Sequence, residues 1–139
     1  GRHLAAMARS MRDRPGPNCL ISGGEPVVTL ADASIRGLGG RNQQLVLAAL
    51  IALAEDGAGR IAILSGGTDG EDGPTDAAGA VLDAEVFARA RQYGLDAADH
   101  LRRNDAYRFF QRLDALIRTG PTHTNVCDVR VVLVDHTEV

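Results

Sequence analysis

A run of ten apolar residues at positions 45–54 limits, more than any other feature, the folds that this chain can adopt. The run reads LVLAALIALA, and Asn42, a residue type that caps helix N-termini, stands shortly before it. The sequence therefore predicts a helix over about residues 43–55. Because this helix is apolar on every side, it must be covered on most of its faces, and the run is too short to span a bilayer. We expect it to be the central helix of a soluble, layered domain.

Strand-like and helix-like segments alternate around this helix. Such alternation predicts an α/β fold, with a mixed or mostly parallel sheet flanked by helices in a single domain. Residues 1–17, a helix followed by a proline-rich linker, are expected to be the end of an upstream domain, and residues 18–139 form the α/β domain. The expected strands are 18–22, 26–30, 60–65 and 129–134, and the other expected helices are 2–11, 76–82, 83–93, a short one from Asp96, and 105–117 capped by Asn104.

The charged residues exclude several classes of function. All 15 basic residues among the 139 are arginine, so this chain contains no P-loop lysine, Schiff-base lysine or lysine base. The net charge of −3 argues against a nucleic-acid partner, and no segment predicts a membrane partner. Two distant cysteines and the absence of a leader-like N-terminus favour a reduced, cytoplasmic protein.

The loop that follows the expected strand 60–65 is rich in glycine and acidic residues. Ligands of α/β sheets bind beyond the carboxyl ends of strands. Glycines let main-chain N–H groups approach an anion, and carboxylates can bind Mg²⁺ or act as a base. An acidic surface turn explains the composition equally well. The candidates for binding an anion are Gly66, Gly67, Thr68 and Thr75, and the carboxylates that could hold Mg²⁺ or act as a base are Asp69, Glu71, Asp72 and Asp76.

Three further segments could bind anions. Arg41 opens the central helix, where the free N–H groups and the helix dipole favour negative charge, although a surface arginine is the simpler explanation. Ser22–Glu25 is a second candidate anion nest, and its Ser-Gly-Gly repeats that of Ser65–Gly67. The polar loop 119–125 could line a cleft, or could be a structural turn, through Thr122, Thr124 and Asn125.

Four motifs together resemble the MOFRL domain of the glycerate 2-kinase family, many members of which have an older hydroxypyruvate reductase label. The resemblance extends from about Leu20 to Val134. Its motifs are GGRNQ at 39–43, GTDGEDGPTDAAGA at 67–80, NDAY at 104–107 and TGPTHTNV at 119–126.

The resemblance implies that the complete enzyme uses ATP and Mg²⁺ to phosphorylate D-glycerate to 2-phosphoglycerate in a cleft between two domains. It implies that Arg41 and Asp69 are catalytic: Arg41 would bind the substrate carboxylate or the transferring phosphate, and Asp69 would orient or deprotonate the attacking hydroxyl, or hold Mg²⁺. Asp72 is a second candidate Mg²⁺ ligand. The N-terminal kinase domain, with its lysine, is an expected partner, a homodimer is an expected assembly, and the chain alone should be inactive. The substrate- or phosphate-binding residues implied are Asn42, Gly66, Gly67, Thr68, Thr122, Thr124 and Asn125.

The chain departs from the family pattern at three positions. Gln44 replaces a common Glu, His123 replaces Gly, and Cys127 replaces Asn. Two alternative functions stay open. An NAD(P)H-dependent hydroxypyruvate reductase would need a dinucleotide fingerprint, which the glycines before Asn42 do not form. A non-catalytic module for ligand binding or oligomerisation would need only the fold.

Overall fold

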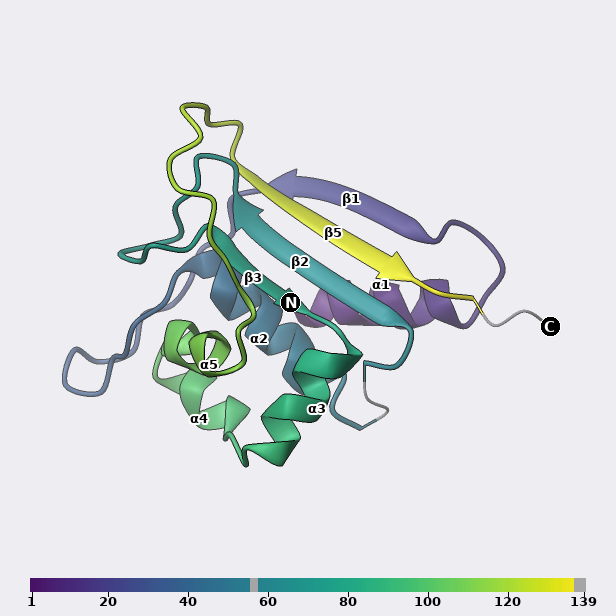
Figure 1. Cartoon of the computed structure of the whole chain (residues 1–139), viewed down its shortest axis with the longest axis horizontal. Coiled ribbons are helices and arrows are strands. Elements are labelled where there is room, and N and C mark those ends of the chain that lie inside the picture. The colour runs from purple at the N-terminus through teal and green to yellow at the C-terminus, as the bar shows by residue number, and fades with distance from the viewer. Residues whose placement is uncertain (56–57, 137–139) are drawn as a thin grey trace.

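A computed structural model of the chain describes residues 1–55 and 58–136 (Figure 1). It contains one five-stranded sheet with the strand order β1-β5-β2-β3-β4. The strands are β1 (Cys19–Gly24), β2 (Ile61–Gly67), β3 (Gly79–Leu82), β4 (Leu116–Ile117) and β5 (Asp128–Val134). The helices are α1 (Arg2–Arg12), α2 (Arg41–Ala52), α3 (Ala84–Gln92), α4 (Ala97–Arg102) and α5 (Ala106–Arg112).

Helix α2 is the centre of the domain, as its apolar run predicts. Its residues from Asn42 to Leu47 are all buried, and it contacts β2, β3 and the helices α1, α4 and α5. A helix of this kind is stable only when other elements cover it on every side. None of the helices in residues 1–55 and 58–136 has the length and apolar character that a membrane crossing needs.

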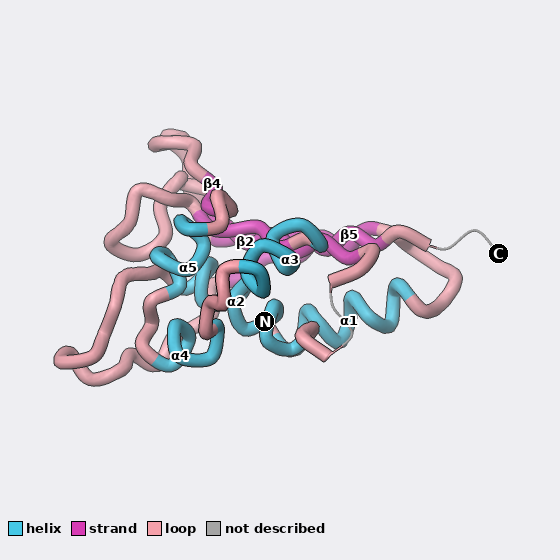
Figure 2. Tube along the Cα trace, turned by 60° about the horizontal axis from the view of Figure 1, so that its bottom comes forward, coloured by secondary structure: helices cyan, strands magenta, loops and turns pink. Residues whose placement is uncertain are grey.

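Both faces of the sheet have apolar side chains, but the side chains of one face are more deeply buried than those of the other. Helices α1 and α2 lie on one side of the sheet (Figure 2). On that face, a row across the strands consists of Leu20, Val132, Ile63 and Leu82, of which the last three are completely buried. The next row, on the opposite face, consists of Ile21, Val131, Leu64 and Val81. Ile21 is 68% exposed, and the other three are only partly buried. One apolar face therefore forms the core and the other is left largely uncovered.

The strand directions differ from the expected parallel or mixed sheet, because every pairing in the sheet is antiparallel. The α/β class and the single domain are confirmed. The expected helix 76–82 is wrong: its second half is strand β3, which returns beside β2. The expected strand 26–30 is also absent, since residues 25–32 form neither helix nor strand.

Helix α5 differs from expectation at both of its ends. Asn104 does not cap α5, because it adopts a φ of 52° and its side-chain oxygen accepts a hydrogen bond from the main chain of Ala31. Helix α5 ends at Arg112, and the chain enters β4 instead of continuing to residue 117. Helix α1 packs into the same core as α2, with Leu4 and Ala8 buried. The assignment of residues 1–17 to an upstream domain stays a prediction.

Candidate functional site

The candidate site lies at the end of the sheet where β1 and β2 finish and β5 begins. Gly24 at the end of β1 and Gly67 at the end of β2 are both paired with Asp128, the first residue of β5. The two Ser-Gly-Gly segments therefore flank one carboxylate. The order of the strands, with β5 between β1 and β2, brings the two similar strand ends together.

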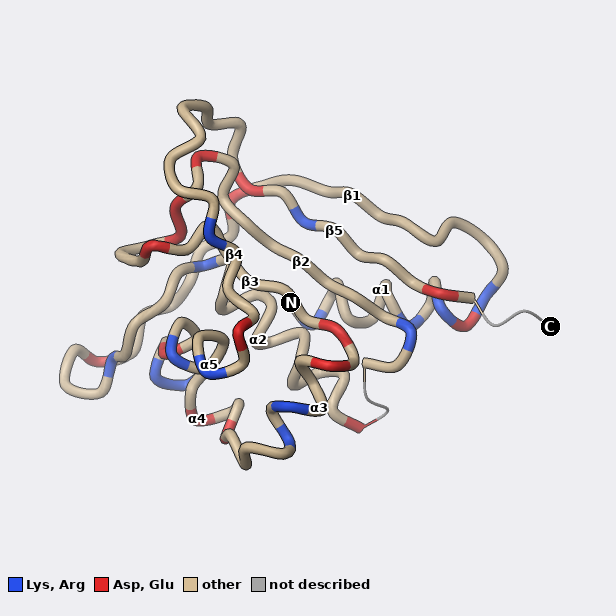
Figure 3. Tube along the Cα trace, in the orientation of Figure 1, with Lys and Arg blue, Asp and Glu red and all other residues tan. Residues whose placement is uncertain are grey.

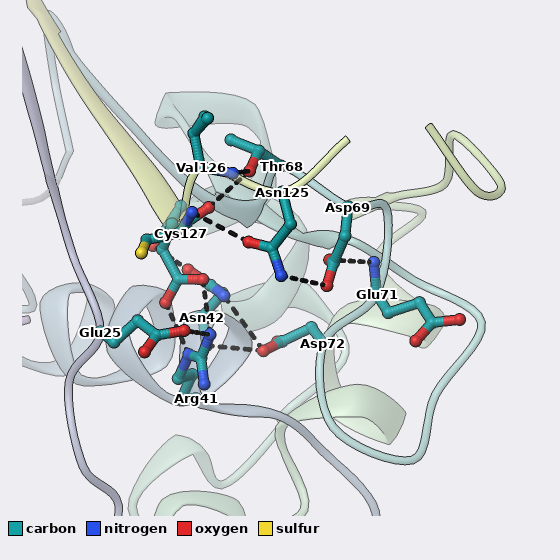
Figure 4. A network of polar contacts seen from close by, with 12 residues as sticks. Glu25, Arg41, Asn42, Thr68, Asp69, Glu71, Asp72, Asn125, Val126 and Cys127 are labelled. Atoms are coloured by element: carbon teal, nitrogen blue, oxygen red, sulfur yellow. Dashed lines mark hydrogen bonds and ion pairs between the residues drawn. The ribbon is translucent and has the colours of Figure 1, made fainter. Parts of the chain in front are cut away.

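Arg41 reaches this carboxylate from the first position of α2 (Figure 4). Its Nε and Nη2 donate to the two oxygens of Asp128 at 2.6 and 2.9 Å, which is a bidentate ion pair. The Asp128 side chain is fully buried, whereas that of Arg41 is 39% exposed. The hydrogen bonds that Arg41 donates to Asp128 raise the pKa of Arg41 well above its ordinary value. Arg41 is therefore held in place as a permanent cation.

A second acid contacts the exposed part of the same guanidinium. Nη2 of Arg41 also donates to Glu25 at 3.0 Å, and the Glu25 side chain is 53% exposed. Within the described part of the chain, no hydrogen bond is made by Nη1 of Arg41. The edge of the guanidinium formed by Nη1 and Nη2 is therefore only partly used, and 39% of the Arg41 side chain is exposed.

The start of α2 is capped by a residue distant in sequence. Asp72 is buried, and its oxygens accept hydrogen bonds from the main-chain N–H groups of Asn42 and Gln43 at 3.0 and 2.9 Å. Asn42, which was expected to cap the helix, instead donates to Asp72 through its amide and accepts from Ser65. Burial is the main cause that raises the pKa of Asp72, and the hydrogen bonds oppose it. Asn42 and Asp72 therefore stabilise the helix start, and their roles in binding a substrate or Mg²⁺ stay predictions.

Hydrogen bonds connect the loop after β2 with the loop before β5. The Thr68 hydroxyl donates to the carbonyl of Cys127 at 2.7 Å and accepts from the N–H of Val126 at 2.8 Å. Thr122 donates through its hydroxyl to the carbonyl of Thr68, and Asn125 lies 3.5 Å from a carboxylate oxygen of Asp69. Four of the predicted residues, Thr68, Asp69, Thr122 and Asn125, are thus brought together, and Figure 4 shows three of them, Thr68, Asp69 and Asn125.

The glycines of this loop have structural roles that differ from the expected anion cradle. Gly66 and Gly67 are part of β2, and the N–H of Gly67 donates to the carbonyl of Ala78. Gly70 has a φ of 93°, and a Cβ there would lie 2.1 Å from the carbonyl oxygen of Gly120. Glycine at this position lets the two loops approach each other closely.

Asp69 is the acidic residue of this loop that is best placed for chemistry. One of its oxygens accepts from the N–H of Glu71 at 3.0 Å, which fixes the side chain, and its other oxygen has only the distant Asn125 amide. Figure 3 shows acidic residues gathered along the loop that follows β2. In the described residues, no three His, Cys, Asp or Glu side chains lie together as a metal site.

Gln44, which departs from the family pattern, follows Arg41 by three residues at the start of α2. It is 6% exposed, and neither its amide nitrogen nor its amide oxygen has a hydrogen-bond partner. Gln43 beside it is also buried, but its amide nitrogen donates to Thr75 at 3.0 Å. A buried polar group without a partner costs free energy of folding.

We therefore expect Gln44→Met to stabilise the domain by about 1–2 kcal/mol, since methionine has nearly the same shape and no unsatisfied polar atom. Urea unfolding monitored by circular dichroism would measure the change. Gln43→Met is the matched control and should be less favourable, because it loses the Thr75 hydrogen bond. A destabilised Gln44→Met protein would contradict the prediction.

Comparison with known proteins places this geometry in a family. The MOFRL family profile matches residues 18–128, which is most of the chain. The chain belongs to the MOFRL family. It is 42% identical over 138 residues to the D-glycerate 2-kinase of Thermotoga maritima, an alignment that covers 96% of this chain and 32% of the relative. It is also 47% identical over 131 residues to a protein of Agrobacterium vitis with a provisional hydroxypyruvate reductase name, covering 93% of this chain and 33% of the relative.

Two solved structures contain the same MOFRL fold. A crystal structure of glycerate kinase from Thermotoga maritima superposes with a TM-score of 0.87 at 41% identity, and covers 96% of this chain and 32% of its own. A crystal structure of a Pyrococcus horikoshii protein also has a TM-score of 0.87, at 31% identity, and covers 97% of this chain and 31% of its own. The MOFRL chain described here thus spans about a third of the length of these relatives.

Two residues of this MOFRL site were missed in the sequence. Asp128 was not singled out, and Glu25 was considered only as part of an anion nest. The repeated Ser-Gly-Gly segments were the available signal for both, because Glu25 follows the first and Asp128 pairs with the last residue of each. Their contacts with Arg41 depend on strand order, which the repeat alone does not specify.

Proposed function

We propose that this chain is the C-terminal domain of a glycerate 2-kinase and forms one wall of the site in which ATP phosphorylates D-glycerate to 2-phosphoglycerate. The observation that supports this most directly is the position of Arg41. It is a fixed cation, held by a buried carboxylate that pairs with Gly67, two residues before Asp69 in the sequence. The names of the relatives, D-glycerate 2-kinase and glycerate kinase, agree with this function.

Each of the two residues has a role in this proposal. Phosphoryl transfer depends mainly on positioning and on neutralising charge. The Nη1–Nη2 edge of Arg41 would bind the carboxylate of glycerate or the transferring phosphoryl group. The less occupied oxygen of Asp69 would orient the attacking hydroxyl or accept its proton. Thr122, Thr124 and Asn125 would line the rim.

The residues present fit Mg²⁺ only in part. Asp72 does not fit, because both of its oxygens accept hydrogen bonds from N–H groups. Asp69 fits as a single ligand. Mg²⁺ bound with the nucleotide would neutralise phosphate charge, and its other ligands would have to come from ATP, water or the rest of the enzyme.

The remaining two thirds of the kinase polypeptide would supply the opposite wall and the lysine that this chain lacks. A cytoplasmic location and a homodimer also belong to the proposal, and light scattering would show the oligomeric state. We expect no ADP release by this chain alone with D-glycerate, ATP and Mg²⁺. Turnover should appear in a chimera that joins this domain to the upstream part of the Thermotoga maritima enzyme.

The chimera also separates the proposal from its alternatives. NADH oxidation with hydroxypyruvate would indicate a reductase, as the Agrobacterium vitis name suggests for that relative. A chimera that is folded but inactive in both assays would favour the non-catalytic module. In that case, calorimetry with D-glycerate and ATP would distinguish a binding domain from one with no ligand.

A further inference from the structure

We infer that Glu25 is an internal competitor for the anion-binding edge of Arg41, so that it determines how tightly this site binds anionic groups. The inference rests on the proposed function, which gives Arg41 the task of binding a carboxylate or a phosphoryl group. It goes further in naming the residue that sets the affinity of that contact and the direction of its effect.

The two acids on Arg41 are held very differently. Asp128 is fully buried and uses both oxygens, at 2.6 and 2.9 Å, so it anchors the guanidinium. Glu25 is 53% exposed and makes one contact, at 3.0 Å. An exposed ion pair of this kind contributes little to stability, typically about 0–1 kcal/mol. Glu25 can therefore be displaced at low cost, whereas Asp128 cannot.

The position of Glu25 on the guanidinium makes it a competitor. Arg has five N–H donors in one plane, and two edges of that plane can bind an oxyanion with two hydrogen bonds. Asp128 occupies the Nε–Nη2 edge. Glu25 accepts from Nη2 and so takes a donor of the other edge, while Nη1 has no partner in the described residues. A carboxylate or phosphate that binds bidentately at this edge needs the donor that Glu25 holds.

The local charge acts in the same direction. Arg41 provides one positive charge, and Asp128 and Glu25 together place two negative charges on it. While Glu25 stays in place, the three groups Arg41, Asp128 and Glu25 together have a net charge of −1, which repels an incoming anion. Once Glu25 has moved away, the remaining Arg41–Asp128 pair is neutral. Removal of the Glu25 charge should therefore strengthen the binding of any anion at this edge.

The backbone at Glu25 allows its side chain to leave without breaking the sheet. Strand β1 ends at Gly24, which has a φ of 136°, and residues 25–32 form neither helix nor strand. No ladder hydrogen bond depends on the Glu25 carboxylate. Among the residues that the structure describes, the Glu25 carboxylate contacts Arg41 alone.

The test compares anion binding by the full 139-residue chain and its Glu25→Gln variant, with inorganic phosphate and D-glycerate as separate probes. Glutamine keeps the length of the side chain and removes its charge. We expect Glu25→Gln to lower the Kd for inorganic phosphate about fivefold at low ionic strength. Glu71→Gln is the matched control, because Glu71 is an exposed acid on the neighbouring loop, and its Kd should match that of the unchanged chain.

If the tighter phosphate binding of Glu25→Gln depends on Arg41, it should vanish when Arg41→Met is also present, because that change removes the N–H donors for which Glu25 and the anion compete. Equal phosphate affinity for Glu25→Gln and the unchanged chain, or an equal gain in Glu71→Gln, would overturn the inference, as would the lack of phosphate binding by all variants. If Glu25→Gln tightens phosphate binding but D-glycerate binds to no variant, the result supports competition by Glu25 and contradicts D-glycerate as the substrate. If both probes bind and neither responds to Glu25→Gln, the competition fails and the proposed function stands.

Discussion

Changing Asp69 to asparagine in the chimera with the Thermotoga maritima upstream part should lower kcat for D-glycerate phosphorylation by about a hundredfold or more. Asparagine keeps an oxygen that can accept from the Glu71 N–H, so the loop should retain its shape. It loses the negative charge and the ability to take a proton from the attacking hydroxyl. Coupled detection of ADP would measure kcat, and KM for D-glycerate should change much less.

The control for this loss is Glu71→Gln in the same chimera. Glu71 lies two residues further along the loop, is exposed, and makes no side-chain hydrogen bond in the described structure. Its replacement removes the same charge from the same loop without touching the Asp69 carboxylate. Similar losses of kcat in the two variants would show that the overall charge of the loop matters, and not a specific role of Asp69.

Replacement of Asp72 by alanine should have the largest effect on stability. The Asp72 carboxylate accepts three hydrogen bonds, two from main-chain N–H groups at the start of α2 and one from the Asn42 amide. Alanine would leave these buried donors without a partner, and would remove a negative charge from the positive end of the helix dipole. We expect a loss of about 3–5 kcal/mol in the free energy of unfolding, measured with urea.

Asp83→Ala provides the comparison for an ordinary helix cap. Asp83 caps α3 through a single contact, from the N–H of Val86 at 2.8 Å, and its loss should cost about 1 kcal/mol. If Asp72→Ala costs no more than Asp83→Ala, then Asp72 is not the main support of the α2 start.

The pH dependence of the Asp72 effect has a definite sign. Burial raises the pKa of Asp72 in the folded domain above the ordinary value of 3.8. In the interval just above 3.8, the folded state keeps a proton that the unfolded state has released. The contribution of Asp72 to stability therefore falls as pH rises through this interval and is constant at higher pH. The difference in the free energy of unfolding between the unchanged chain and Asp72→Ala should therefore decrease as pH rises through this interval.

The predictions that succeeded depend on local patterns. The apolar run at 45–54 correctly predicts a buried helix, and Asp83 followed by an amphipathic segment correctly predicts α3 and its cap. The prediction of a helix at 76–82 was wrong because the alanines of this segment favour a helix, whereas pairing with β2 makes its second half a strand. A Cβ at Gly79 would lie 1.9 Å from the Ser65 carbonyl oxygen, so glycine there permits close pairing of two strands. That contact is not visible in the residues around Gly79.

The candidate site was only half predictable for a similar reason. Arg41 and Asp69 stand in motifs that are recognisable by themselves. Asp128 lies 87 positions from Arg41 in the sequence, and only the strand order brings the two side chains together. The sequence suggests Asp72 as a metal ligand because its loop is acidic. Its role as the cap of α2 depends on the path of that loop, which brings Asp72 next to Asn42 and Gln43.

The uncovered face of the sheet has a practical consequence for work with this domain. Ile21, Val131 and Leu133 present apolar side chains there without supporting the core, and exposed apolar patches of this kind promote aggregation. Threonine suits a β-strand and is polar, so threonine at these three positions should improve solubility at little cost in packing. These side chains lie on a face of the sheet, whereas Arg41 contacts Asp128 at one end of it, so substitutions on the face should leave the candidate site unchanged.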